Sequence, residues 1–562
     1  MHQAELTSLA IENMKSFKER TEIPIRPLTI IIGRNNSGKS TLIQSLLLLK
    51  QTLQEPRKSI PLHLSGPLLQ ALNLRELTFG WPEAAASGEA VLGPSIELAW
   101  QCFVKVSDVL DSSRRKSLGQ IAAIGRSPWL MRLQGEGAPD RFFVKGRLCI
   151  YTHEKEGVAH LRGLQIYMQV PEHSSERYKL EVINHENEKW RIFWQGVESR
   201  NITVELSTQS NKKGTFEYTD THFDHFIPYL NIDRKRVRSN SIERVWHDLY
   251  LILFAQPLED LKELVKNFSY LSAQRISPQF MFIPATTDQL DMGVSGEFAA
   301  QVLYRRQNDV VHFVPPESLM ADVVSEAWQE SSILALPLRD AVNQIMRSLA
   351  VEAPLRVRDH GVGFQLLFGN ANLPHVGRGL NGLLPLVELG LLADPLRFSP
   401  TAESLTLEEY AEKCASCSHI FLEEPEAHIH PKAANRLAHY FVSLAMAQRR
   451  LMVETHSDHL VRGLRRMAAQ AKPGSFLEKW LLDNVVIIHV SQDAQGCSQV
   501  ETSQLTVEGD LQEKWPADFM DAATDEESEI YFAKLDKNDA ADKHGSALIW
   551  EEGEEPESEV ML

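Results

Sequence analysis

Residues 33–40 read Gly-Arg-Asn-Asn-Ser-Gly-Lys-Ser, a glycine-rich loop of the form G-x-x-x-x-G-K-S. An apolar run, residues 28–32, precedes the loop, and residues 41–49 repeat apolar positions at helical spacing. The loop therefore joins a buried strand to the start of a helix, which predicts an α/β fold. In such a loop, successive backbone N–H groups and the helix N-terminus surround a phosphate group. The sequence predicts a nucleotide-binding loop.

The side chains and the backbone of the loop have different expected roles in binding phosphate. Lys39 supplies a positive charge, and the hydroxyl of Ser40 supplies a ligand for Mg²⁺. The backbone of the rest of the loop cradles the phosphates, so the expected nucleotide-binding residues are Gly33, Asn35, Asn36, Ser37, Gly38, Lys39, Ser40 and Thr41.

Two further apolar runs end in groups that can act on a nucleotide. Residues 419–422 lead into Glu423 and Glu424, and residues 451–453 lead to His456. Ligands collect at the carboxyl ends of strands in α/β sheets, so we expect these groups beside the loop. Alone, a Glu-Glu pair is usually solvated and a histidine is usually structural. Together they predict ATP hydrolysis, in which Glu423 holds Mg²⁺ directly or through water, Glu424 polarises the attacking water, and His456 donates to the γ-phosphate.

Length and composition indicate how many structural units the chain has and in which compartment it works. The 562 residues exceed the usual size of a single core, which predicts more than one structural unit. No apolar stretch approaches the roughly 20 residues of a membrane span, and the N-terminus lacks a secretory signal pattern. The five scattered cysteines do not form a disulfide framework. We therefore expect a cytoplasmic protein without a membrane partner.

The formal charge of −17 is unevenly distributed. Residues 521–562 hold fourteen acidic residues and three lysines, which is typical of a solvated tail. Basic clusters occur at residues 114–116, 234–238 and 462–466. Each permits contact with nucleic acid without establishing it, so DNA stays open as a partner.

The pattern of apolar residues predicts how the chain is organised. Residues 6–32 alternate as a strand pair that leads into the loop, and residues 92–206 contain many short strands. Residues 241–271 and 317–350 have helical spacing. We expect an N-terminal ATPase segment (1–90), a β-rich and helical insertion (91–265), a C-terminal ATPase segment (266–510), and a short C-terminal domain with an acidic tail (511–562).

The acidic pair, the proline after it and the strand-end histidine resemble the ATP-binding-cassette (ABC) class of P-loop ATPases. Residues 422–431, Leu-Glu-Glu-Pro-Glu-Ala-His-Ile-His-Pro, and residues 454–457, Glu-Thr-His-Ser, are similar to motifs of the overcoming-lysogenisation-defect (OLD) and SMC-like bacterial ATPases. The resemblance implies an ABC/SMC-like ATPase head, built from N- and C-terminal segments that flank a large insertion.

Residues 270–275, 293–298 and 515–521 resemble a subfamily with a short C-terminal domain of unknown function. In that resemblance, residues 377–385 stand where the family has its signature element, which binds the γ-phosphate held by the opposite subunit. Gly377, Gly379 and Asn381 are the expected contacts, although the family usually has Ser and Gln where this chain has Asn381 and Gly382. The resemblance implies a homodimer or higher homo-oligomer that encloses ATP.

OLD proteins carry a metal-dependent nuclease domain with a D-x-D pair, and no D-x-D follows His456 here. We therefore expect no intrinsic nuclease. The resemblance implies an ATPase that regulates a separately encoded effector, a nuclease or toxin, in antiphage defence. Two alternatives stay open: an SMC- or RecF-like ATPase that binds DNA in repair or maintenance, and an ATP-binding scaffold with slow turnover.

Overall fold

A computed structural model describes residues 4–83, 89–111, 140–170, 177–185, 189–195, 202–205, 220–231, 247–284, 291–319, 333–401, 403–414 and 416–513. The chain separates into two compact units, Met1–Glu513 and Lys514–Leu562. All of the described residues belong to the first unit. The acidic tail, the residues 515–521 and the basic clusters at 114–116 and 234–238 lie outside the described residues.

A six-stranded sheet of strand order β12-β18-β19-β3-β20-β21 forms the centre of the nucleotide-binding part. All neighbouring strands are parallel except β20 and β21, which are antiparallel. Every residue of β3 is buried, as expected for a parallel strand covered on both faces. The strands are β3 (Leu28–Ile32), β12 (Ser269–Leu271), β18 (Ser418–Glu423), β19 (Arg449–Glu454), β20 (Val485–Gln492) and β21 (Ser498–Ser503).

Four helices accompany this sheet. The helix that follows the loop, α1, and the helix that joins β18 to β19, α11, both contact β19, and α12 packs on α11. Their bounds are α1 (Lys39–Gln54), α11 (Pro431–Met446), α12 (Asp458–Gln470) and α13 (Phe476–Asn484). The α/β class predicted from the sequence is therefore confirmed.

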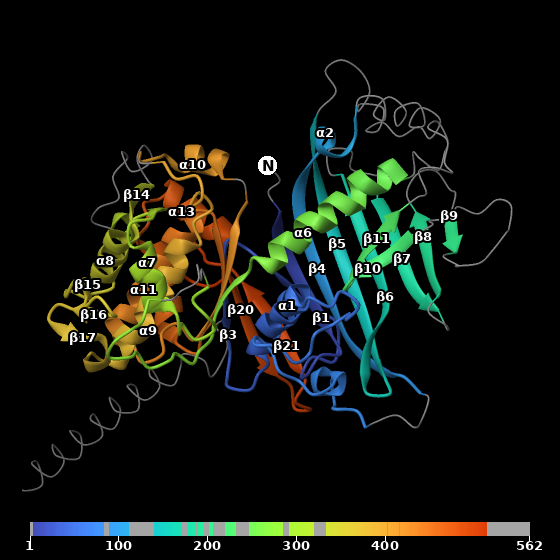
Figure 1. The fold of residues 1–562 in the computed structure, drawn as a ribbon, viewed down its shortest axis with the longest axis horizontal. Helices are drawn as coiled ribbons and strands as arrows, with labels where there is room; N and C mark the ends of the chain where they lie inside the picture. The colour runs from blue at the N-terminus through green and yellow to red at the C-terminus, as the bar shows by residue number, and fades with distance from the viewer. Residues whose placement is uncertain are drawn as a thin grey trace, which may run out of the picture. The chain divides into compact units, whose positions relative to one another are not determined.

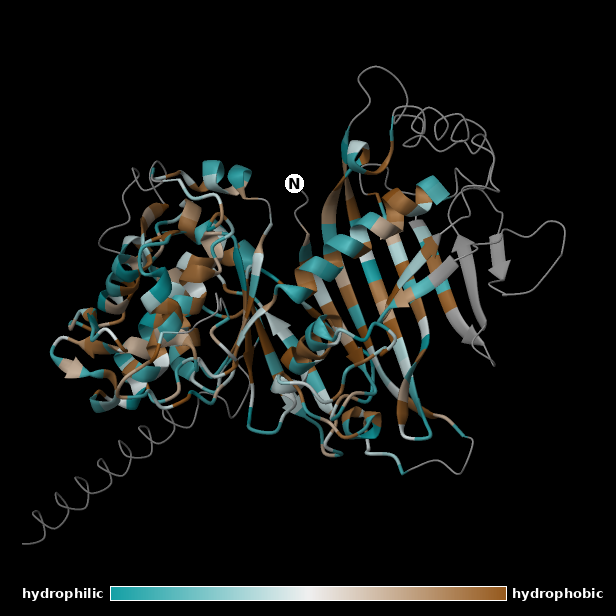
Figure 2. Ribbon diagram, in the orientation of Figure 1, coloured by the Kyte–Doolittle hydropathy of each residue, from teal (hydrophilic) through white to brown (hydrophobic). Residues whose placement is uncertain are grey.

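An eight-stranded antiparallel sheet accounts for the predicted β-rich segment, in the order β2-β1-β4-β5-β6-β7-β8-β9. Helix α6 (Gln256–Lys266) lies across it in Figure 1 and contacts β4. Buried and partly exposed residues alternate along β4, and Figure 2 shows the corresponding hydropathy alternation. The strands are β1 (Glu5–Glu12), β2 (Thr21–Pro24), β4 (Val91–Lys105), β5 (Arg141–Lys155), β6 (Val158–Gln169), β7 (Arg177–His185), β8 (Lys189–Gln195) and β9 (Ile202–Glu205).

A helical region follows, in which α7 (Ala299–Arg306) and α8 (Leu338–Ser348) pack against α9 (Arg378–Leu392). Small sheets complete it, formed by β13 (Val310–Phe313) with β14 (Leu334–Pro337), and by β15 (Leu355–Asp359), β16 (Phe364–Phe368) and β17 (Ala371–Asn372). The remaining elements are α2 (Val106–Val109), α10 (Leu407–Lys413), η1 (Leu74–Leu77), η3 (Leu251–Ala255), η4 (Pro316–Leu319), η6 (Leu373–His375), β10 (Asp220–Asp224) and β11 (Ile227–Asn231).

Two helical predictions were wrong in part, one at its end and one in its middle. Within 241–271, the last residues form β12, because they pair with the apolar strand β18. Within 317–350, residues 334–337 form β14, which pairs with β13. In both places, pairing with a distant strand overrides local helical spacing. Among the described residues, none of the helices combines the length and apolar character needed to cross a membrane.

Candidate nucleotide site

The glycine-rich loop is held in a shape that only glycine accommodates at two positions. Gly33 has φ +149°, and a Cβ placed there would lie 2.1 Å from the carbonyl oxygen of Val490. Gly38 has φ +104° and precedes α1 without a side-chain cap. The N–H of Thr41 donates to Gly38 O at 3.0 Å, and the N–H groups of the first two residues of α1 precede any intrahelical acceptor, so they are available to an anion at this end of the helix.

Lys39 folds back over the loop. Its Nζ donates to the carbonyl oxygens of Gly33 at 3.0 Å and Arg34 at 2.7 Å. Burial lowers the pKa of the Lys39 ammonium, while the carboxylates of Glu454 and Glu424 oppose that shift. Among the described residues, the Lys39 ammonium donates to carbonyl oxygens, and it is well placed to exchange them for phosphate oxygens.

Strand order brings the predicted groups to one edge of the sheet. Strand β19 lies between β3 and β18, and all three run parallel. In this register Glu423 of β18 is directly opposite Glu454 of β19. The carboxyl ends of β3, β18 and β19 therefore meet, as the sequence predicted.

Glu454, to which the sequence analysis gave no role, contacts Ser40, one of the two predicted Mg²⁺ ligands. The Ser40 hydroxyl donates to Glu454 Oε1 at 2.8 Å. Burial raises the pKa of Glu454, and the neighbouring carboxylate of Glu423 raises it further. The signal that could have identified Glu454 is its position as the last residue of an apolar strand, two residues before His456.

Glu424 and His456 form the second pair at this edge. Glu424 has φ +42°, a conformation that is uncommon for a residue with a side chain, and its N–H donates to Glu454 O at 2.8 Å. This bond ties the end of β18 to the end of β19. His456 Nε2 lies 3.3 Å from Glu424 Oε1. Burial and the nearby Lys39 lower the pKa of His456, although Glu424 opposes them, which favours a neutral imidazole.

Further groups support these residues. Glu426 Oε1 accepts from Thr455 Oγ1 at 2.6 Å and from the N–H of His456 at 3.2 Å, which fixes the turn after β19. Arg275 donates to the carbonyl oxygen of Glu423 at 3.3 Å, and burial lowers its pKa to about 10 against the pull of nearby carboxylates. Burial raises the pKa of Glu423 too.

The signature-like element begins helix α9. Gly377 is the N-cap, and the ideal Cβ position of Gly379 lies 2.6 Å from His428 O, in the turn that follows β18. The element thus packs on the same turn that presents Glu424. A cavity of about 50 Å³ beside Asn381 is also lined by Ser295 and Gly296, which places the residue 293–298 stretch against α9.

The carboxylates at the ends of β18 and β19 can hold Mg²⁺ only if phosphate and water oxygens complete its coordination. Glu423 Oε1 and Glu454 Oε2 are buried and have no hydrogen-bond partner among the described residues. Within those same residues, no group of three or more His, Cys, Asp or Glu side chains is arranged to hold a metal ion. Mg²⁺ is commonly bound by one or two carboxylates plus nucleotide phosphates and water, and Ser40, Glu423 and Glu454 match that donor set.

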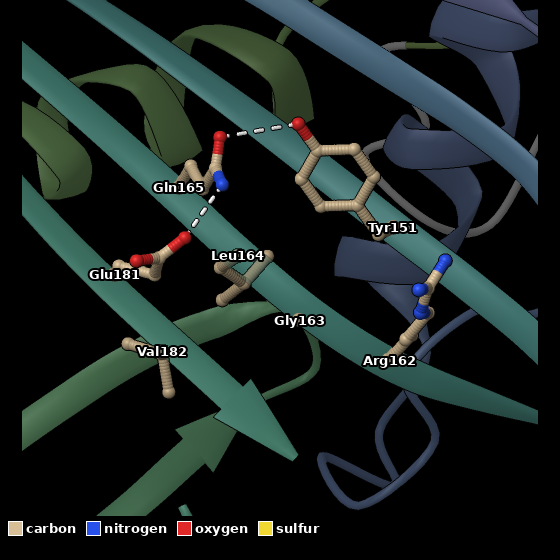
Figure 3. A pocket seen from close by; sticks show the side chains of 7 residues that line it. All are labelled: Tyr151, Arg162, Gly163, Leu164, Gln165, Glu181 and Val182. Atoms are coloured by element: carbon tan, nitrogen blue, oxygen red, sulfur yellow. Dashed lines mark hydrogen bonds between the residues drawn. The ribbon is translucent and has the colours of Figure 1, made fainter. Parts of the chain in front are cut away.

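A cavity of about 260 Å³ lies elsewhere, on strands β5 to β7. Tyr151 donates to Gln165 at 3.2 Å, and Gln165 donates to Glu181 at 2.6 Å (Figure 3). These polar groups are satisfied by one another, and the cavity contains none of the predicted site residues. Two arginines of the basic cluster of α12 are also paired, since Arg462 contacts Asp458 and Arg465 contacts Asp510, each at 2.7 Å.

A comparison with protein families supports the assignment of residues 33–40 as a nucleotide-binding loop. The family model described as "AAA ATPase domain" matches residues 5–112. None of the curated proteins compared with the chain matches it.

Among solved structures, the chain is similar to three SMC heads. An Smc head bound to the C-winged helix domain of ScpA shares 13% identity, covering 89% of this chain and 98% of that one, with a TM-score of 0.38. The SMC head domain of Thermotoga maritima shares 12% identity over 88% and 98%, with a TM-score of 0.29. The Smc head with an extended coiled coil, bound to the C-terminal domain of ScpA derived from Pyrococcus furiosus, shares 13% over 90% and 97%, with a TM-score of 0.33.

Proposed function

We propose that this chain binds ATP with Mg²⁺ and hydrolyses it. The observation that carries the proposal is the meeting of three parallel strand ends, which puts Ser40 2.8 Å from Glu454 and Glu424 3.3 Å from His456. The match of residues 5–112 to an ATPase domain supports it. We also propose that residues 1–90 and 266–510 form the ATPase part of the chain, that residues 91–265 are an insertion, and that residues 511–562 form a C-terminal domain.

The residues divide the work of phosphoryl transfer. Lys39 and the loop N–H groups bind the phosphates, and Ser40 and Glu423 hold Mg²⁺, which neutralises charge on the β- and γ-phosphates when bound. Glu424 accepts a hydrogen bond from the attacking water and orients it. His456 contributes its Nε2 beside Glu424, where a neutral imidazole can donate to the γ-phosphate in one tautomer.

We further propose that ATP joins two copies of the chain. Supporting this, Gly377 and its neighbours begin a helix beside the turn that carries Glu424, so a helix N-terminus is available to a phosphate held by another copy. A two-fold arrangement would use the same surface on both copies. Hydrolysis would then remove the phosphate that joins them.

Control of a separately encoded effector, a nuclease or toxin in antiphage defence, rests on the resemblance to OLD ATPases alone. The test is to purify tagged Glu424→Gln protein from its native host with ATP and Mg²⁺, and to identify what is retained by it but not by Lys39→Ala. A retained nuclease or toxin supports effector control. Retention of DNA alone, lost at high salt, would instead establish the SMC- or RecF-like alternative.

Phosphate release by the purified protein tests the ATPase itself. Wild-type protein should release phosphate from ATP in the presence of Mg²⁺, and Glu424→Gln should not. Absence of ATP binding by the wild type would refute the proposed function.

A further inference from the structure

The carboxylate of Glu454 is only partly satisfied by hydrogen bonds among the described residues. The residue is 4% exposed, and one carboxylate oxygen, Oε1, accepts from Ser40. The other, Oε2, is buried without a hydrogen-bond partner among the described residues. A buried carboxylate with an unpaired oxygen is costly, by about 1–3 kcal/mol or more for a charged group, so Oε2 calls for either a proton or a cation beside it.

The surroundings point to a cation. Glu454 is opposite Glu423 in register, and Glu423 Oε1 is also buried and without a partner among the described residues. Two adjacent carboxylates repel one another unless a cation or a proton lies between them. Lys39 and Arg275 supply part of that positive charge, but Lys39 Nζ is hydrogen-bonded to loop carbonyls and Arg275 donates to the backbone carbonyl oxygen of Glu423.

The Ser40 hydroxyl gives the link to the metal. When a hydroxyl oxygen ligates a cation, its proton points away and needs an acceptor. Glu454 Oε1 occupies that position, 2.8 Å from Ser40 Oγ. An acceptor of this kind fixes the hydroxyl orientation and makes its oxygen a better donor to the metal.

We propose that Glu454 is a positioning residue of the magnesium site, which accepts the Ser40 proton and so presents the Ser40 oxygen to Mg²⁺. This inference rests on the proposed function, because it requires Mg²⁺ to enter with ATP. It gives Glu454 a role that the sequence analysis did not assign to any residue, and it leaves Glu423 as the carboxylate that holds Mg²⁺.

The test measures metal use rather than turnover. Binding of a fluorescent ATP analogue is titrated with Mg²⁺ for wild type, Glu454→Gln and Glu454→Asp. Glu454→Gln should raise the Mg²⁺ concentration at half-maximal binding by roughly 10- to 100-fold, the usual effect of losing an outer-shell carboxylate. Glu454→Asp should restore part of the loss because it keeps the charge. Electron paramagnetic resonance of Mn²⁺ added with ATP should show the same order of affinities.

A control and a double variant separate the explanations. Glu478→Gln alters a buried carboxylate in α13, where Oε2 accepts from Gly474 at 2.6 Å, and should leave the Mg²⁺ dependence unchanged. In Ser40→Ala protein, adding Glu454→Gln should cause little further loss, because Glu454 acts through the missing hydroxyl. Unfolding temperatures without nucleotide show whether each variant is folded.

The outcomes are distinct. If wild type binds no ATP analogue at any Mg²⁺ concentration, the proposed function fails. If wild type binds it and Glu454→Gln has the wild-type Mg²⁺ dependence, only the present inference fails. A full additional loss in the Ser40→Ala background would also overturn it, since Glu454 would then act independently of Ser40.

Discussion

His456 Nε2 lies 3.3 Å from Glu424 Oε1, across the ends of two neighbouring parallel strands. This contact places Glu424, the proposed base for the attacking water, beside His456, which can donate a hydrogen bond to the γ-phosphate. Glu424→Gln keeps the shape of the side chain and removes its negative charge. We expect this variant to bind ATP with near-normal affinity and to release phosphate at least ~10²-fold more slowly. Nucleotide binding and phosphate release, measured on the same preparation, check both parts.

Glu408, an exposed residue of α10, provides a matched control. Glu408→Gln should turn over ATP at the wild-type rate. Turnover by Glu424→Gln that equals the control would move the catalytic base to another residue.

Lys39 is 3% exposed and makes hydrogen bonds only to loop carbonyls among the contacts described above. Lys39→Ala removes the positive charge at the phosphate position, so we expect the loss of measurable nucleotide binding. Equilibrium binding of a fluorescent ATP analogue tests this, with Lys479→Ala on the exposed face of α13 as the control. Normal affinity in a folded Lys39→Ala protein is incompatible with the phosphate-binding loop.

The sequence was sufficient to predict the loop, the α/β class and the two apolar strands that lead to Glu423 and His456. Each depends on a local pattern, an apolar run followed by polar residues with a recognisable spacing. The contact between Ser40 and Glu454 could not be predicted in the same way. It depends on β19 inserting between β3 and β18, and on the register of that pairing, which local spacing does not encode.

The same limit explains the helical predictions that ended in strands. Ser269–Leu271 continues a helical pattern, but its pairing with Ile420–Leu422 extends the central sheet and positions Arg275 near Glu423. Hydrogen bonding to β18 and the burial of Leu271 outweigh the small helical preference of three residues.

The proposed two-copy arrangement is tested at Gly377. No atom lies within 4 Å of the Cβ position of Gly377, and its backbone angles suit any residue, so Gly377→Trp should fold normally. In a Glu424→Gln background, we expect Gly377→Trp to keep ATP binding and to lose ATP-dependent dimerisation, because the indole blocks the face of the helix N-terminus. Light scattering after size-exclusion chromatography measures the mass.

Gly379→Trp should prevent the dimer as well, but it is the less specific variant. Its Cβ would lie 2.6 Å from His428 O, so it would also displace the turn after β18. Glu352→Trp, on an exposed loop position, is the control for a bulky addition. An ATP-dependent dimer that persists in both glycine variants contradicts the proposed arrangement.

A buried ionic network joins the far end of α9 to the start of β19. Asp394, His312 and Arg449 have fully buried side chains; Asp394 Oδ2 lies 2.8 Å from His312 Nδ1, and Oδ1 accepts from Tyr410 at 2.6 Å. Asp394→Ala leaves the Arg449 cation without its carboxylate, which should lower the free energy of unfolding by about 3–5 kcal/mol.

Urea unfolding measures this loss. Tyr410→Phe removes a single hydrogen bond to the same carboxylate and should cost less, about 1–3 kcal/mol. A change below about 1 kcal/mol for Asp394→Ala would show that the network adds little to stability.

Glu388, in the middle of α9, predicts a pH dependence of stability. Its side chain is fully buried, neither carboxylate oxygen has a hydrogen-bond partner among the described residues, and burial raises its pKa well above 4.5. The folded protein therefore keeps this proton at pH values where the unfolded chain has released it. Because the unfolded state then binds fewer protons, the contribution of Glu388 to stability is greatest below pH 4.5 and falls as the pH rises toward the folded pKa.

Glu388→Gln removes this titration while keeping the side-chain shape. We expect the free energy of unfolding of the variant, minus that of wild type, to increase with pH above 4.5 by up to about 1.4 kcal/mol per pH unit. Taking this difference cancels the titration of all other groups common to both proteins. Glu412→Gln, at an exposed position of α10, is the control for replacing a carboxyl by an amide. A flat difference for Glu388→Gln would mean that the Glu388 carboxyl titrates in the folded protein as it does in the unfolded chain.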